Sequence, residues 1–203
     1  KPEAQANEAM KGAKNPIQAA FNYQNYLFNL EMAKFAGKDV NVVADIESID
    51  NLDLTEDQKN KAKKAYGTDT QVGSNAIIID GKIIIFESNI MERITQSDGV
   101  EAAVAAVSPL HEVGHAEAAA QGLIKDGKLV GDAKQVINGI TSYVSNLAAA
   151  GKMSKEDFEN FTNRIEAYKT DEGVDVDELI QLVADFTNAG ILDKSSYDKV
   201  WQI

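Results

Sequence analysis

The chain of 203 residues contains no cysteine, which excludes a disulfide framework and a thiolate metal site. Basic residues are also scarce: 20 Lys and Arg stand against 32 Asp and Glu, and the formal net charge is −12. Such a charge disfavours binding to nucleic acid or to an anionic membrane. No apolar run is long enough to span a bilayer, and no signal peptide is visible. We therefore expect neither nucleic acid nor membrane as a partner, and these features select no cellular compartment.

Histidine is almost absent as well, and both histidines of the chain lie in the stretch His111-Glu112-Val113-Gly114-His115. Positions i and i+4 stack on one face of an α-helix, so the two imidazoles can bind one metal ion. Glu112 projects about 100° around the helix from His111 and can reach a water molecule on that ion. Residues 108–109, serine and proline, are a typical helix start, and Gly122 is a natural stop.

The residue types of this motif predict a particular chemistry. Two neutral imidazoles and one carboxylate leave zinc one open position for water, whose pKa the metal lowers towards neutrality. Glu112 is expected to act as general base and then as general acid towards the leaving amine. We therefore predict Zn²⁺ as cofactor, His111 and His115 as metal ligands and Glu112 as catalytic residue. The competing interpretation is a surface helix that carries these side chains without binding metal.

The motif helix, with the stretch His111-Glu112-Val113-Gly114-His115-Ala116, resembles the active-site helix of zincin metallopeptidases, in particular the gluzincins. The resemblance is strong over this helix and loose over residues 75–172. It implies a zinc endopeptidase of the HExxH type that hydrolyses peptide bonds in a peptide or protein substrate. It also implies an edge strand to which substrate adds as an antiparallel strand, and residues 76–86 supply a candidate. The alternative is that this hairpin is only structural.

The third protein ligand must be Asp or Glu, because the chain has no further histidine. The metzincin extension is excluded, since Ala118 and Gln121 stand where it needs glycine and histidine. We predict Glu166, which follows His115 by 166 − 115 = 51 residues and lies in a Glu-Ala-Tyr context that resembles the gluzincin ligand. The alternatives are Glu159, Asp132 and Asp171.

Further residues are expected to support the site, and several candidates stay open for each role. A carboxylate that holds the far nitrogen of a metal-bound histidine would be Asp171 or Glu172. Thr170 stands where thermolysin-like enzymes have that aspartate, which is a departure from their pattern. The candidates for an oxyanion donor are Tyr143, Tyr168 and Arg164.

The patterns along the chain predict a predominantly helical α+β fold: a zincin-like domain with a small sheet and a helical C-terminal third. Helices are predicted at 16–35, 55–66, 89–107 with a break at 98–99, 108–121, 132–150 and from 154 onward, a short strand at 40–46, and a hairpin at 76–86. Asp80-Gly81 fits a type I′ hairpin turn, and its flanking isoleucine runs indicate strands covered on both faces. Ala150-Gly151 and Ala189-Gly190 are predicted to be helix-ending turns, each followed by a helix.

The predicted organisation is a flexible or helical lead-in at 1–15, a metallopeptidase domain at 16–172, and a C-terminal helical hairpin at 173–203 packed on it. Because the chain begins with Lys1 rather than methionine, we expect a processed product or a part of a longer polypeptide or assembly. This leaves two alternatives to a free-standing endopeptidase. One is a zincin-like structural or interaction module of a larger virion or mobile-element protein, catalytically weak or inactive. The other is a processing enzyme that acts only on its own precursor.

Overall fold

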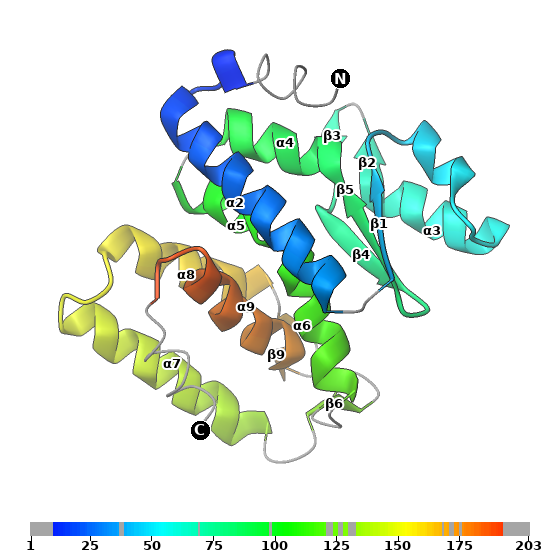
Figure 1. Ribbon diagram of the computed structural model, residues 1–203. Helices are drawn as coiled ribbons and strands as arrows, with labels where there is room; N and C mark the ends of the chain where they lie inside the picture. The colour runs from blue at the N-terminus through cyan, green and yellow to red at the C-terminus, as the bar shows by residue number, and fades with distance from the viewer. Residues whose placement is uncertain are drawn as a thin grey trace. The chain divides into compact units, whose positions relative to one another are not determined.

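The structure is a computed structural model that describes residues 10–36, 39–68, 70–97, 99–120, 124–125, 128–129, 133–167, 169–170, 173–174 and 176–192. Helices predominate in it, and the strands form one three-stranded sheet and several two-stranded ribbons (Figure 1). The predicted α+β class is therefore confirmed. The chain divides into two compact units, Lys1–Val113 and Gly114–Ile203. The predicted domain boundaries at residues 15 and 172 stay a prediction.

The first unit places helices around a small mixed sheet. Its elements are α2 (Pro16–Phe35), β1 (Asp39–Val43), the 3-10 helix η1 (Glu47–Asn51), α3 (Glu56–Tyr66), β2 (Gly67–Thr68), β3 (Gln71–Val72), β4 (Ala76–Ile79), β5 (Lys82–Phe86), α4 (Glu87–Gln96) and α5 (Gly99–Ala106). The sheet order is β1-β5-β4, with β1 parallel and β4 antiparallel to β5. Strands β2 and β3 form a separate ribbon.

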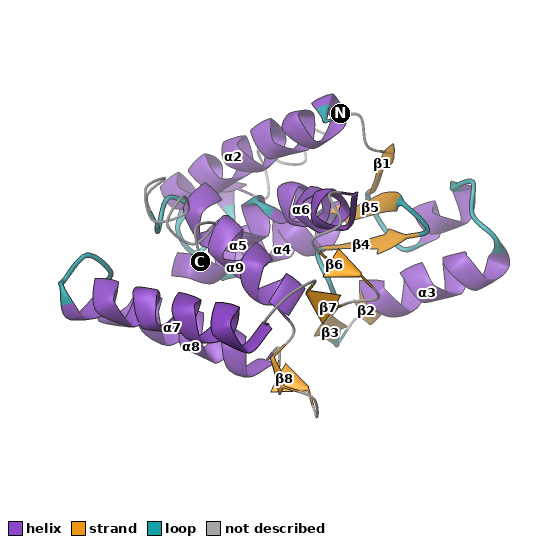
Figure 2. Ribbon diagram, turned by 90° about the horizontal axis from the view of Figure 1, so that it is seen from below, coloured by secondary structure: helices purple, strands orange, loops and turns teal. Residues whose placement is uncertain are grey.

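Strand β5 is the centre of this unit, because its side chains are buried on both faces of the sheet. Ile83 and Ile85 pack with residues of α2, α4 and α5. Ile84 and Phe86 pack with residues of η1 and α3 on the opposite face. Figures 1 and 2 show α3 on one side of the sheet and α4 on the other. The prediction of strands covered on both faces is confirmed.

Local sequence signals predicted the ends of several of these elements correctly. Asp80 and Gly81 have φ angles of 48° and 80°, as the predicted type I′ turn requires. Thr55 begins α3 with a capping box, in which the Gln58 backbone N–H donates to Thr55 Oγ1 at 3.2 Å and the Thr55 N–H donates to Gln58 Oε1 at 3.0 Å. The predicted break of the 89–107 helix lies between the end of α4 and the start of α5.

The second unit is mostly helical in its described part. Helix α6 (Ser108–Ala120) leads into it, and the further elements are β6 (Ile124–Lys125), β7 (Lys128–Leu129), α7 (Ala133–Ala149), α8 (Lys155–Ala167), β8 (Lys169–Thr170), β9 (Gly173–Val174) and α9 (Val176–Asn188). Helices α7, α8 and α9 pack together, and Ile140, Phe161 and Phe186, one from each helix, are at most 1% exposed. The Phe161 and Phe186 rings meet edge to face at 5.3 Å between centroids.

The two predicted helix-ending turns have the same hydrogen bonds. Gly151 and Gly190 have φ angles of 72° and 80°. Lys152 N–H donates to the Leu147 carbonyl, and Ile191 N–H donates to the Phe186 carbonyl, both at 2.9 Å. After the first turn Ser154 caps α8 by accepting from the Asp157 N–H at 3.0 Å, as predicted. The helix predicted after Asp193 lies outside the described residues.

Candidate metal centre

Helix α6 carries both histidines of the chain. It begins at Ser108 as predicted, and the N–H groups of Leu110 and His111 donate to the Val107 carbonyl at 3.0 and 3.2 Å. Ser108 is buried at 8% exposure, which anchors the start of the helix. The helix runs without interruption to Ala120, so His111 and His115 lie one above the other on the same face.

Helix α9 has an apolar and a polar face. Leu182, Val183 and Phe186 belong to the core, where they hold the helix against α7 and α8. Glu178, Gln181 and Asp185 are spaced by three and four residues and therefore share a neighbouring face. Gln181 and Asp185 are each only 3% exposed, although both side chains are polar. A buried polar face next to a hydrophobic one marks α9 as more than a packing element.

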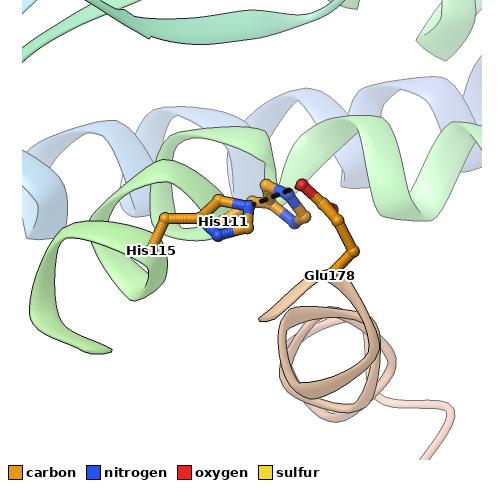
Figure 3. Close-up of side chains that lie close together, drawn as sticks. All are labelled: His111, His115 and Glu178. Carbon is orange, nitrogen blue, oxygen red and sulfur yellow. Dashed lines mark ion pairs between the residues drawn. The ribbon is translucent and has the colours of Figure 1, made fainter. Parts of the chain in front are cut away.

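The side chains of His111, His115 and Glu178 converge. One ligand atom from each lies within 4.8 Å of the other two. His115 Nε2 lies 3.1 Å from Glu178 Oε1, and these two side chains are 15% and 30% exposed. Figure 3 shows the two imidazoles reaching from one helix towards the carboxylate on the other. The site is half-buried and still accessible.

This arrangement suits a metal ion by donor type and by the distance between His115 and Glu178. Zinc bonds of 2.0–2.2 Å to nitrogen and oxygen place neighbouring ligands of a tetrahedral site about 3.4 Å apart. The separation of 3.1 Å between His115 and Glu178 is close to that value. Two imidazoles and one carboxylate also form a donor set that binds divalent transition metals. The described residues therefore include a group that can hold a metal ion.

Gly114 lets α9 come close to α6 beside this group. A Cβ atom at Gly114 would lie 1.9 Å from Oε1 and 2.7 Å from Cδ of Gln181. Such distances are too short for a Cβ atom, so any other residue would require the end of the buried Gln181 side chain or α9 itself to move. Because Gln181 follows Glu178 by three residues on α9, the contact lies one helical turn from the carboxylate that faces the histidines.

No protein-family model, curated protein or solved structure matches the chain. No helix of the described part combines the length and apolarity that a membrane crossing requires.

The carboxylate beside the histidines differs from the one we predicted. Glu166 lies on α8, where Phe161 and Ile165 turn inward to the core and leave Glu166 exposed. The ligand group formed by the described residues contains Glu178 instead. Glu159 is exposed too, with Lys155 Nζ at 3.8 Å. Asp132 and Asp171 lie outside the described residues.

The structure describes only some of the other predicted site residues. Glu112, Tyr143 and Arg164 are half-buried on α6, α7 and α8, and their roles stay predictions. Tyr168 and Glu172 lie outside the described residues. Sequence reasoning missed Glu178, which follows His115 by 178 − 115 = 63 residues. Its signal was the spacing of the polar positions 178, 181 and 185 along one face of a helix whose other face is apolar.

Proposed function

We propose that this protein is a zinc-dependent endopeptidase of the HExxH type, with His111, His115 and Glu178 as metal ligands. The observation that carries the proposal is the convergence of these three ligand atoms within 4.8 Å. Three protein ligands of the His₂Glu type are typical of catalytic zinc, because they leave a coordination position open. Glu178 takes the role that the sequence suggested for Glu166.

Each motif residue then has a distinct task. Zinc held by the three side chains would supply a Lewis acid that polarises the peptide carbonyl and lowers the pKa of water. Glu112 follows His111 directly and projects about 100° further around α6. Its carboxylate would accept the proton of the attacking water and pass it to the leaving nitrogen. Half-burial of His115 and Glu178 would restrict competing solvent while admitting an extended chain.

The substrate of the proposed reaction is a peptide or protein. The resemblance of the motif helix to zincin metallopeptidases implies this choice, and β1 and β4 are the edge strands of the three-stranded sheet in the described residues. An edge strand offers backbone N–H and C=O groups that an extended peptide can pair with as an additional strand. The proposal therefore favours extended, unstructured stretches of protein over folded helices as substrates.

Metal content tests the ligand assignment. Elemental analysis should find about one zinc per chain in the wild-type protein. Glu178→Ala should lose it, and Glu166→Ala is the matched control that should retain it, because Glu166 is an exposed glutamate of α8. Loss of zinc in the Glu166 variant and its retention in the Glu178 variant would return the assignment to Glu166.

The reaction is tested with Glu112→Gln. This variant should keep its zinc and lose peptide hydrolysis, because glutamine cannot accept the proton. Hydrolysis of an unstructured protein such as casein would be followed for the wild type and the variant at equal zinc content. Equal rates would contradict the mechanism. Bound zinc without any hydrolysis in the wild type would favour the structural or interaction module instead.

A further inference from the structure

Helix α2 exposes a row of large apolar side chains. Ile17, Phe21, Phe28, Met32 and Phe35 are 83%, 75%, 63%, 44% and 88% exposed, and we call this set the α2 stripe. At 100° per residue all five point into an arc of about 60° on one side of the helix. Scattered apolar residues on a surface are ordinary, but a continuous row of this kind marks an interaction site.

The α2 stripe is not required to anchor the helix in its own unit. Ala19, Tyr26 and Leu30 on the other side of α2 are buried in the cluster that covers the sheet. Asn29 Nδ2 adds a hydrogen bond of 3.0 Å to the Ala106 carbonyl of α5. The helix thus has two apolar sides, one of them already packed, which is typical of a helix that also packs against a second body.

We propose that the α2 stripe is a homodimer interface, in which it packs antiparallel against the α2 stripe of a second copy of this chain. Three phenylalanines of this exposure, with Ile17 and Met32, present roughly 600 Å² of surface, given 150–250 Å² for each aromatic side chain. Two copies would bury about 1,200 Å², which is the lower end of the range for specific interfaces.

The order of residues in α2 favours a second copy as the occupant. Phe21, Phe28 and Phe35 recur every seven residues, and Gln24 and Glu31 lie midway between them. Antiparallel pairing that sets position 28 against position 24 places Phe21 and Phe28 against the gaps between phenylalanines of the other copy and sets Phe35 against Ile17, as knobs fit into holes. Parallel pairing would set Glu31 against the Glu31 of the other copy, and like charges repel. A self-complementary surface of this kind closes with two-fold symmetry.

The net charge of −12 argues against an anionic membrane as the occupant of the stripe. The charged side chains within α2 are Glu31 and Lys34, which pair with each other at 3.5 Å. The stripe therefore carries little charge of its own and suits an apolar, self-matched partner.

Molar mass in solution tests the interface. Sedimentation or light scattering of the full chain should give twice its mass of 22.0 kDa. Phe28→Lys should raise the dimer dissociation constant at least about thirtyfold, as for a central aromatic anchor. Asn60→Lys adds the same charge to the exposed side of α3 and should leave the dimer unchanged. Circular dichroism would show that each variant keeps its helices.

The arrangement of the two helices has its own test. In the antiparallel dimer position 28 faces position 24 of the other copy, so Phe28→Lys combined with Gln24→Glu should recover much of the lost dimer. A dimer lost in Phe28→Lys and not recovered in the double variant would overturn the antiparallel arrangement.

Three further outcomes would overturn the interface itself. The first is a wild-type protein that is monomeric over the whole concentration range. The second is a dimer that persists in Phe28→Lys, which would show that another surface forms it. The third is a wild-type monomer that floats with lipid vesicles of mixed anionic and neutral composition, which would assign the α2 stripe to a membrane surface.

Discussion

Gly114 is the residue at which the proposed metal centre depends on a missing side chain. Gly114→Ala would place a Cβ atom 1.9 Å from Oε1 of Gln181, which is 3% exposed and has little room to move. The end of the Gln181 side chain or α9 must then shift, and because Gln181 is buried we expect α9 to move and carry Glu178 away from His115. We expect zinc affinity to fall about 10- to 100-fold, the range for residues that position metal ligands. Competition with a zinc-binding indicator dye would measure it.

A fall in zinc affinity in Gly114→Ala would identify the contact with Gln181 as its cause, and not helix propensity. Alanine stabilises an isolated helix relative to glycine by about 1 kcal/mol, so helix propensity alone would strengthen α6. Shortening the opposing side chain in Gly114→Ala/Gln181→Ser should recover affinity, because it removes the atom in conflict. An unchanged affinity in Gly114→Ala would contradict the role of this contact.

Tyr26 is a buried titratable residue outside the metal centre. It is 0% exposed, and its hydroxyl donates to Glu87 Oε2 at 2.7 Å. Burial first, and then the charge of Glu87, raises the pKa of Tyr26 far above its ordinary value of 10.0. The folded state therefore holds the phenol neutral where the unfolded chain ionises it.

This raised pKa predicts how stability changes with pH. The stabilisation of the folded state that comes from the neutral Tyr26 phenol is fully present below about pH 10. It is lost progressively as pH rises above that value, since only the unfolded chain releases the proton. Tyr26→Phe should cost about 1–3 kcal/mol at neutral pH, because Glu87 loses its donor. Urea unfolding should show that the difference in free energy of unfolding between wild type and variant is smaller at about pH 11 than at neutral pH. A difference in free energy of unfolding that is the same at both pH values would contradict the raised pKa of Tyr26.

The β4-β5 hairpin shows how one turn can determine an element. Gly81 has φ of 80°, and a Cβ atom added there would meet no neighbour within 4 Å. Gly81→Ala is thus strained by its backbone conformation alone and should lower the free energy of unfolding by about 1 kcal/mol. Asp80→Asn is the matched control, because asparagine tolerates the left-handed conformation, and it should change stability by less than about 0.5 kcal/mol. Thermal unfolding would compare the stability of the two variants. Equal losses of stability would point to side-chain contacts and not to backbone strain as the cause.

The proposed metal also has a consequence for the whole molecule. Glu178 is separated from His115 by most of the second unit, so the ligands converge only in the folded chain. A metal that binds the folded state alone raises the free energy of unfolding by about 2.7 kcal/mol at a free concentration of one hundred times its dissociation constant. Calorimetry should show zinc raising the wild-type midpoint, reversed by a chelator, and leaving Glu178→Ala unmoved. An equal shift in both proteins would contradict the site.

Most elements of the fold were predictable, because the interactions that begin and end them are local. The capping box joins Thr55 to Gln58, the hairpin turn depends on Asp80-Gly81, and α6 begins at its Ser-Pro pair. These contacts act within a few residues and are visible in any single sequence. The strand predicted at residues 40–46 is the shorter Asp39–Val43, because its end depends on pairing with β5.

The α2 stripe shows a limit of periodicity. The sequence predicts a helix at residues 16–35, and this helix contains several aromatic side chains. Apolar residues occur all around α2, however, and only the tertiary structure decides which side meets the sheet. Tyr26 is buried, whereas Phe21, Phe28 and Phe35 are exposed.

For the candidate site, the sequence alone determined the pair of histidines and their common helix face, and it predicted an acidic third ligand. Which carboxylate lies beside the histidines was decided by the tertiary structure. Glu166 and Glu178 both lie on helices after the motif, and the local context favoured Glu166. The rotation of each helix depends on which of its apolar side chains enter the core. That packing leaves Glu166 in solvent and brings Glu178 to His115, because burial couples residues far apart in sequence.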